Sequence, residues 1–348
     1  MAPRSDGLGS ASRRTVLRAL AGGMGYALMS SRSMAAEGGA ALYADAGLGA
    51  YGFPAGHPLG VDRQGAFLAE AAAQGLVGRV ARHASRKATR QEIERFHTAA
   101  HVERVRDAER SGLEFLDQGD TPVFPGVFEA GSAVVGAALD GLARIMRGEF
   151  ERALQPVGGL HHAGRGHAAG FCVFNDLGVV IETLRSVHGI RRVGYVDIDV
   201  HHGDGVFYAF EQDPELIFAD IHEDGRFLYP GTGQEEETGK GAAAGTKLNI
   251  PLAAGSGDEE FARAWKRVEA HLARFEPEFL LLQCGADGLD GDPLAHLRYS
   301  SATHALAARR LRAFARRHCR GRLMAFGGGG YDRANLARAW SAVLRELA

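Results

Sequence analysis

The clearest potential for chemistry lies in residues 195–205, Tyr-Val-Asp-Ile-Asp-Val-His-His-Gly-Asp-Gly. The first half alternates apolar and acidic residues and predicts a strand, whereas the glycines of the second half predict a turn. Because side chains alternate across a strand, Asp197, Asp199 and His201 should share one face, opposite three apolar residues. Desolvating an isolated carboxylate costs at least several kcal/mol, so these carboxylates need a cation. We favour a metal ion on Asp199 and His201 over a solvated polar loop, because the acidic positions lie inside the apolar run.

A third metal ligand is available in Asp287, which follows a second predicted strand. Asp199, His201 and Asp287 would leave a fourth position for water or substrate, as catalytic zinc sites do. The set contains no thiolate, so iron or cobalt would suit it as well as zinc. Taken alone, Asp287 could equally be a helix N-cap or a turn residue. The residues after it, Gly-Leu-Asp at 288–290, do not provide the second Asp-x-Asp of a binuclear site, so we expect one metal ion.

Two adjacent histidines, His161 and His162, lie in a glycine-rich stretch at 158–163. A single histidine there would more often be a surface group or a satisfied core group. A pair suits hydrolysis, in which one group takes a proton from an activated water and another protonates the leaving amine. Asp197 and Asp204 are not needed for the metal and could each orient one of the imidazoles.

Four glycines at 327–330 precede Tyr331 at the end of another predicted strand. A phosphate-binding loop is disfavoured, because the sequence lacks the contexts of the known glycine-rich phosphate motifs. A tyrosine carried there can instead donate its hydroxyl to a developing oxyanion, where one donor is worth about 2.7–4 kcal/mol. Two other aromatic residues, Phe171 and Tyr229, could be ordinary core residues.

The elements that must position these residues alternate along the chain between strands and helices. Further strands are predicted at 40–43, 216–221, 247–252, 279–283 and 323–326. Helices are predicted at 64–74, 90–109, 128–146, 177–187, 261–275 and 336–347. This alternation predicts an α/β fold, a single domain with a mostly parallel central sheet and helices on both faces. Ligands of such sheets bind beyond the carboxyl ends of the strands, where Asp199, Asp287 and Tyr331 are expected.

Composition narrows the classes of partner. The 348 residues are 45% hydrophobic and 24% charged, with a net charge of -2 and no basic stripe, so nucleic acid is not an expected partner. The three cysteines, Cys172, Cys284 and Cys319, form no Cys-x-x-Cys motif. This argues against both a disulfide framework and a thiolate zinc site.

Residues 1–36 have the features of a twin-arginine signal peptide, and residues 37–348 would form the catalytic domain. Arg13 and Arg14 precede a weakly apolar stretch at 16–29 and small residues at 33–36. That stretch is too short and too rich in glycine to predict stable membrane insertion. We therefore expect a periplasmic or otherwise exported protein. The alternative is a disordered basic tail on a cytoplasmic protein.

With these residues assembled, the chain from about residue 40 to 340 resembles the zinc-dependent histone deacetylase family, including its bacterial deacetylase-like and acetylpolyamine amidohydrolase branches. The motifs are Gly-Leu-His-His-Ala at 159–163, Gly-Phe-Cys at 170–172, Asp-Ile-Asp-Val-His-His-Gly-Asp-Gly at 197–205, Pro-Gly-Thr-Gly at 230–233, Gln-Cys-Gly-Ala-Asp at 283–287 and Gly-Gly-Gly-Gly-Tyr at 327–331. The resemblance implies the arginase/deacetylase fold and hydrolysis of the amide of acetyl-lysine, acetylpolyamine or a related small amide. The alternative is a non-catalytic protein of the same fold that binds a metal or an acyl ligand.

The resemblance also implies roles for individual residues. Asp199, His201 and Asp287 would bind one zinc ion per chain. For the proton transfers it implies His162 as the general base, His161 as an electrostatic or acid partner, Asp197 and Asp204 as the groups that orient them, and Tyr331 as the group that polarises the acyl carbonyl.

Substrate contacts are implied by position. Asp120 resembles the rim carboxylate that holds substrate backbone amides, and Arg63 resembles the arginine beneath the site. A tunnel for a small-molecule or peptide acyl-amine would be lined by Gly170, Phe171, Leu294 and Tyr229. The family usually has Phe at the position of Tyr229, so a hydroxyl is added to the tunnel wall.

Two departures bear on ions and regulation, while the oligomeric state stays open. Asp220 replaces a serine that is common beside a potassium site near Asp197 and Asp199, which leaves a structural potassium ion as an open expectation. Ala334 stands where class I eukaryotic members carry an arginine that binds inositol phosphate. Regulation by a corepressor and inositol phosphate is therefore not expected.

Overall fold

The computed structural model describes residues 39–54 and 56–348, so the predicted signal peptide at 1–36 lies outside the described residues. Eight strands form one sheet in the order β2-β1-β3-β8-β7-β4-β5-β6, and every pairing is parallel. The strands are β1 (Ala40–Tyr43), β2 (Ala81–His83), β3 (Arg152–Gln155), β4 (Val193–Asp197), β5 (Leu216–Glu223), β6 (Lys247–Leu252), β7 (Phe279–Gln283) and β8 (Leu323–Phe326).

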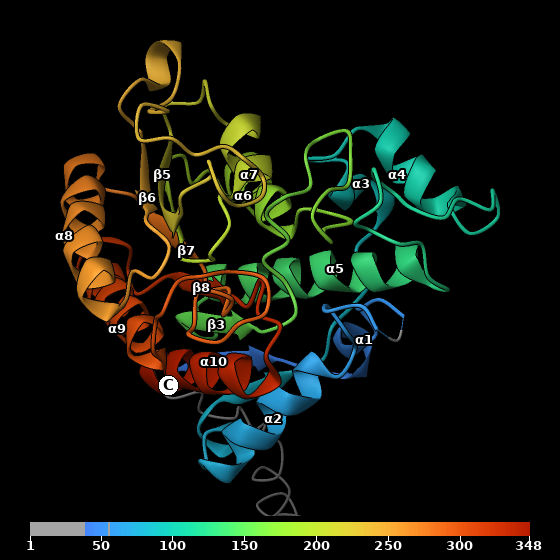
Figure 1. Cartoon of the computed structure of the whole chain (residues 1–348), viewed down its shortest axis with the longest axis horizontal. Coiled ribbons are helices and arrows are strands. Elements are labelled where there is room, and N and C mark those ends of the chain that lie inside the picture. Colours follow the sequence, from blue (N-terminus) through green and yellow to red (C-terminus); the bar gives the residue numbers. More distant parts are fainter. Residues whose placement is uncertain (1–38, 55) are drawn as a thin grey trace, which may run out of the picture. The chain divides into compact units, whose positions relative to one another are not determined.

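Helices cover both faces of the sheet (Figure 1), as the sequence predicts for this α/β fold. Helices α4, α5 and α6 share one hydrophobic core with the sheet, and α2, α8, α9 and α10 share the other. The helices are α1 (Ala46–Gly49), α2 (Arg63–Ala73), α3 (Arg90–Ile93), α4 (Ala99–Asp107), α5 (Val127–Met146), α6 (Asp176–Ser186), α7 (Asp204–Ala209), α8 (Asp258–Phe275), α9 (Ser301–His318) and α10 (Arg333–Leu347). Within the described part of the chain, no helix combines the length and apolar character needed to cross a bilayer.

Strand β4 shows how the sequence pattern produces these two cores. It lies between β7 and β5, so both of its faces are covered. Val193 and Tyr195 point into the first core, and Val196 points into the second, which also takes up Ile198 and Val200 beyond the strand end. Burying each of these aliphatic side chains contributes about 1.5–3 kcal/mol. The alternation therefore fixes the direction in which the following polar residues emerge.

The structure differs from the sequence prediction at a few elements. The helix predicted at 90–109 is two helices, because Thr98 caps α4 by accepting a hydrogen bond from the His101 amide. Strands β2 and β3 were not predicted. The end residues of β3 are polar and buried in the core. Arg152 Nε donates to Leu347 O at 2.8 Å and Gln155 Nε2 donates to Val134 O at 2.9 Å, while Gln155 Oε1 has no hydrogen-bond partner among the described residues.

Candidate active site

Four neighbouring strands, in the order β3-β8-β7-β4, deliver the candidate residues to one edge of the sheet. All run in parallel, so their carboxyl ends meet there. The His161–His162 loop follows β3, Tyr331 follows β8, Asp287 follows β7, and the Asp199–His201 segment follows β4. Residues distant in the sequence therefore become neighbours.

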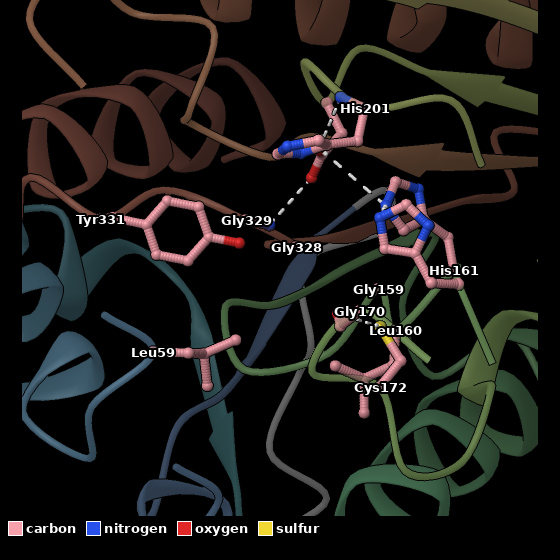
Figure 2. Close-up of a pocket in the computed structure, with 12 residues that line it drawn as sticks. Leu59, Gly159, Leu160, His161, Gly170, Cys172, His201, Gly328, Gly329 and Tyr331 are labelled. Atoms are coloured by element: carbon pink, nitrogen blue, oxygen red, sulfur yellow. Dashed lines mark hydrogen bonds and ion pairs between the residues drawn. The ribbon is translucent and has the colours of Figure 1, made fainter. Parts of the chain in front are cut away.

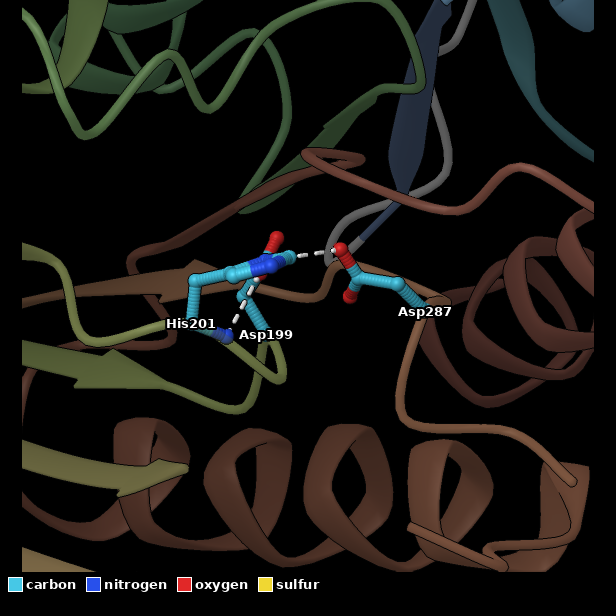
Figure 3. Close-up of side chains that lie close together, drawn as sticks. All are labelled: Asp199, His201 and Asp287. Carbon is cyan, nitrogen blue, oxygen red and sulfur yellow. Dashed lines mark hydrogen bonds and ion pairs between the residues drawn. The ribbon is translucent and has the colours of Figure 1, made fainter. Parts of the chain in front are cut away.

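The candidate metal ligands Asp199, His201 and Asp287 are buried and face one another (Figure 3). Their ligand atoms all lie within 4.8 Å of one another. His201 Nδ1 is 3.2 Å from Asp199 Oδ1 and 3.2 Å from Asp287 Oδ2. This spacing is compatible with a single ion at the centre of the group.

The donor set fits a divalent cation. Gln283 Nε2 and the Gly329 amide each donate to Asp199 Oδ2 at 2.9 Å, which orients that carboxylate. The Val200 amide donates to Asp287 Oδ1 at 3.1 Å, while Asp287 Oδ2 is buried and accepts no hydrogen bond. An unsatisfied buried carboxylate oxygen is costly, and coordination of a cation would satisfy it.

Glycines permit the close approach of the surrounding backbone. A Cβ atom at Gly285 would lie 1.9 Å from Asp199 Oδ2, and one at Gly329 would lie 2.0 Å from Asp287 Oδ2. Neither distance is sterically allowed. Gly285 and Gly329 are therefore explained by packing against the candidate metal ligands.

The electrostatics of the group also show its need for a positive charge. Burial raises the pKa of Asp287 to about 6, and the charge of Asp199 adds to this effect. Burial alone would lower the pKa of His201, yet the adjacent carboxylates of Asp199 and Asp287 raise it to about 10. A bound divalent cation would supply the positive charge that the imidazolium otherwise provides.

Each of the two adjacent histidines is held by its own carboxylate. His161 Nδ1 lies 2.8 Å from Asp197 Oδ2, and His162 Nδ1 lies 2.6 Å from Asp204 Oδ1. Asp197 Oδ2 also accepts a hydrogen bond from the Tyr195 hydroxyl. Because each carboxylate accepts a hydrogen bond from an Nδ1–H group, each neutral ring presents its Nε2 atom as an acceptor.

The two Nε2 atoms lie 3.1 Å apart, and both rings line the pocket described below. A hydrogen bond between them requires a proton on one of the two nitrogens. Burial lowers the pKa of His162, and the neighbouring His161 lowers it further. His162 therefore favours the neutral form that a general base requires.

Tyr331 directs its hydroxyl into the pocket, toward the side where His161 and His201 lie (Figure 2). Burial raises its pKa well above the ordinary value, so the hydroxyl stays protonated and can donate. Arg63, buried beneath the loop, donates to Gly328 O at 2.6 Å and to Gly330 O at 2.9 Å. The arginine therefore fixes the glycine-rich segment that carries the tyrosine.

Asp292 is a positioning residue that the sequence analysis missed. Its Oδ2 atom accepts hydrogen bonds from the Tyr331 amide at 2.7 Å and the Asp332 amide at 3.3 Å. The carboxylate thus supports the tyrosine loop from the β7 side. Its position after Asp287 and Asp290 was the only signal, and a contact to a distant backbone leaves no sequence pattern.

Two connected pockets lie at this edge of the sheet. The inner pocket is lined by Leu59, Gly159, Leu160, His161, His162, Gly170, Cys172, Asp199, His201, Gly328, Gly329 and Tyr331. The entrance pocket has a volume of about 220 Å³ and is lined by Asp120, His162, Gly170, Phe171, His201, Leu228, Tyr229, Leu294 and Tyr331. The two share His162, Gly170, His201 and Tyr331, so they are adjacent, and the inner pocket reaches the candidate metal ligands Asp199 and His201.

The entrance pocket gathers all the residues assigned to the substrate by resemblance except Arg63, which lies under the tyrosine loop. Phe171 adopts a φ of 68°, an uncommon conformation for a bulky residue. It is held there because its amide donates to Thr121 Oγ1 at 3.1 Å and its carbonyl accepts from the Tyr51 hydroxyl at 2.7 Å. Tyr229 packs edge-on against the His162 ring, with centroids 5.0 Å apart. Two aromatic rings therefore line the entrance pocket, and the Phe171 backbone is held by hydrogen bonds.

Asp220, the expected potassium-site substitution, is fully buried near the candidate dyads. Its Oδ2 atom accepts from the Gly203 amide at 2.9 Å, and its Oδ1 atom lies 2.7 Å from His222 Nδ1. Both carboxylate oxygens thus have protein partners. The binding of a potassium ion stays a prediction.

Known proteins are similar to this chain over most of its length. A family model of the histone deacetylase domain matches residues 57–347. The acetoin utilization protein AcuC of Bacillus subtilis (strain 168) is 38% identical over 271 residues, which cover 75% of this chain and 70% of that protein. Histone deacetylase RPD3 of Saccharomyces cerevisiae is 34% identical over 309 residues, covering 86% of this chain and 70% of that protein.

Among solved structures, the crystal structure of the HDA15 HD domain matches with a TM-score of 0.81 and 29% identity. The match covers 90% of this chain and 88% of that one. The arginase/deacetylase fold expected from the sequence is thereby confirmed. The chain belongs to the histone deacetylase family.

Proposed function

We propose that this protein is a zinc-dependent deacetylase that hydrolyses the amide of an acylated amine, such as acetyl-lysine, an acetylpolyamine or a related small amide. The observation that carries the proposal is that three sets of side chains, each suited to one part of amide hydrolysis, converge at one pocket. The metal-ligand group, two histidines backed by carboxylates and a tyrosine hydroxyl all meet there. Family membership, including a relative named as a histone deacetylase, supports the same chemistry.

Asp199, His201 and Asp287 would hold the zinc ion. When bound, zinc polarises an acyl carbonyl and lowers the pKa of a water molecule toward neutrality. The entrance pocket, with Phe171 and Tyr229 on its walls, suits an extended aliphatic chain that ends in an acyl group. Asp120 at the same pocket can accept hydrogen bonds from amide or ammonium groups of the substrate.

The residues of the chain would move the protons. His162 Nε2 takes a proton from the attacking water, while Asp204 holds Nδ1 and stabilises the imidazolium that forms. The Tyr331 hydroxyl donates a hydrogen bond to the oxyanion of the tetrahedral intermediate. When the C–N bond breaks, a protonated histidine of the pair delivers the proton to the leaving nitrogen. The products are a carboxylate and a free amine.

The central test replaces Tyr331 by Phe in the zinc-loaded protein. Turnover of acetyl-lysine peptides and acetylated polyamines should fall about 10²–10³-fold, because one oxyanion donor is lost. Zinc content should not change. The matched control is Tyr208→Phe, which removes a hydroxyl on α7 that bonds to Glu237 at 2.7 Å. Unchanged turnover in Tyr331→Phe would refute the assigned role.

A second experiment tests the metal. Asp287→Ala should reduce the bound zinc from one equivalent to a small fraction after dialysis, measured by elemental analysis. Asp290→Ala, in the same loop with a 74% exposed side chain, should retain the metal. If the wild-type protein binds zinc but hydrolyses no member of the substrate panel, the alternative of a non-catalytic acyl-ligand or metal-binding protein is supported instead.

A further inference from the structure

Lys247, the first residue of the edge strand β6, is a buried cation that the proposed chemistry does not use. It is 2% exposed and is among the largest fully buried side chains. Lysine is almost never fully buried unless its charge is compensated. Only four of the 40 basic residues are lysines, namely Lys87, Lys240, Lys247 and Lys266. In a chain this rich in arginine, the buried position holds the more compact ammonium group.

Three oxygen atoms surround the ammonium of Lys247. Its Nζ atom donates to Asp213 O at 2.7 Å, to Leu216 O at 2.7 Å and to Thr246 Oγ1 at 2.9 Å. All three acceptors are uncharged. Among the described residues Lys247 forms no ion pair, and the carboxylate of Asp213 is already bonded to Arg185. Neutral oxygen dipoles therefore compensate the charge, as carbonyl rings do for a bare alkali cation.

The cage of oxygens is built into the fold. Thr246 donates its hydroxyl proton to Ala243 O at 2.8 Å, which leaves its lone pairs facing the ammonium. The aliphatic stem of Lys247 is covered by Gly239, where a Cβ atom would lie 3.1 Å from Lys247 Cγ and 2.5 Å from Ala243 O. Gly239 also has a φ of 95°, which favours glycine. These contacts leave the ammonium little freedom.

The cage joins β6 to the turn between α7 and β5. Asp213 lies in that turn, and Leu216 begins β5. Helix α7 begins at Asp204, whose carboxylate holds His162 Nδ1 at 2.6 Å. The segment that ends at the cage therefore starts at the candidate dyad.

We infer that the Lys247 ammonium is a tethered cation in a carbonyl cage, and that it positions the α7–β5 turn and, through α7, Asp204. Lys247 is a positioning residue, because it is buried at the start of the edge strand β6 and lines neither pocket. The inference rests on the proposed function only for its activity measurement. Without the tethered ammonium, the same cage should accept a free monovalent cation of similar size.

The test is cation rescue of Lys247→Ala in the zinc-loaded protein. Thermal unfolding and turnover are measured at equal ionic strength in the chlorides of tetramethylammonium, methylammonium, ammonium and potassium. In tetramethylammonium, which is too large for the cage, the Tm of Lys247→Ala should lie about 5 °C below that of the wild type, because the oxygens lose their donors. At least half of the loss should return with the smaller cations, and kcat should recover with KM unchanged.

Two matched variants separate charge from packing. Lys247→Met fills the space of the stem without a charge, so it should lose stability and resist rescue, because its side chain blocks the cage. Lys240→Ala removes an exposed lysine that pairs with Glu211 at 3.0 Å, and it should show neither loss nor rescue. The inference fails if Lys247→Met matches the wild type, or if Lys247→Ala has the same Tm in all four salts. Because Tm does not depend on activity, either result stands apart from failure of the proposed function.

A measurement on the wild-type protein does not depend on the folding of any variant. With ¹⁵N-lysine, only four side chains carry the label. A caged ammonium should give a slowly exchanging ¹⁵N–¹H correlation near neutral pH, whereas exposed ammonium groups exchange too fast to be seen. The absence of that correlation would overturn the inference.

Discussion

At the scale of single residues, two histidines outside the catalytic set support the pocket wall. His97 Nε2 accepts a hydrogen bond from the Asn175 amide at 2.8 Å, and His101 Nε2 lies 2.9 Å from Val173 O, to which it donates. Asn175 in turn caps α6 and donates to Ala163 O at 2.8 Å, next to the histidine pair. Burial lowers the pKa of His97 to about 3 and that of His101 to about 4. Both are therefore neutral in the folded protein.

These pKa values predict that stability falls in acid. The unfolded chain protonates each histidine near its ordinary pKa of about 6.5, whereas the folded chain does so only near 4 and 3. Above about pH 6.5 these two histidines do not lower the free energy of unfolding. As the pH falls below this value the free energy of unfolding decreases, by about 2 kcal/mol for each histidine at about pH 5. Urea unfolding above about pH 6.5 and at about pH 5 measures the loss of stability.

His101→Gln isolates one of these contributions. Glutamine can still donate to Val173 O but does not titrate. The variant should therefore lose less stability than the wild type on acidification, by about 2 kcal/mol at about pH 5. The exposed His318→Gln serves as the control and should retain the wild-type dependence. A dependence in His101→Gln equal to that of the wild type would contradict the assignment.

At the scale of elements, helix α5 packs unusually closely against the segment at 84–88. Ala88 N donates to Ser132 O at 2.8 Å, and a Cβ atom at Gly136 would lie only 1.9 Å from Arg86 O. Backbone cannot yield as a flexible side chain can. The missing side chain at Gly136 therefore sets the distance between the helix and this segment.

The same substitution at two helical glycines should have opposite effects. Gly136→Ala should destabilise the protein by about 1–3 kcal/mol or more, since either α5 or the segment must shift. Gly65→Ala in α2 meets no atom within 4 Å and should stabilise by about 0.5–1 kcal/mol through helix propensity. Urea unfolding of both variants checks the difference. Equal effects would show that packing at α5 does not control the outcome.

How far the sequence predicts the structure also depends on the element. Strands β1, β6, β7 and β8 begin and end at the predicted residues. β1, β7 and β8 are short apolar runs between clear breaks, whereas β6 alternates polar and apolar residues over its first four positions. Strand β2 was missed because its residues are polar and largely exposed, and β3 because Arg152 and Gln155 break the apolar run. The candidate metal ligands, the histidine pair with its two carboxylates and Tyr331 were all named from the sequence. Their distances, and the support from Asp292, depend on strand order, which no local pattern encodes.

At the scale of the whole molecule, we propose that residues 1–36 direct export by the twin-arginine route. They lie outside the described residues, and the support is the arginine pair, the apolar stretch and the small residues that follow. Replacing Arg13 and Arg14 together by Lys should retain the protein in the cytoplasm of a bacterium that has this pathway. Cell fractionation measures the distribution. Arg316→Lys with Arg317→Lys, at exposed positions in α9, is the control, and identical distributions would refute the proposal.

The strand order has a consequence for synthesis on the ribosome. Strand β8 lies between β3 and β7, and Arg152 of β3 pairs with Leu323 of β8. The first three strands and the four strands β4 to β7 therefore emerge as two groups that cannot join until β8 has been made. In a nascent chain that stops before β8, the edges of β3 and β7 that β8 later covers stay unpaired. Such edges are prone to aggregation and need protection by chaperones. Tyr331 follows β8 directly, so the pocket is completed only when translation is nearly finished.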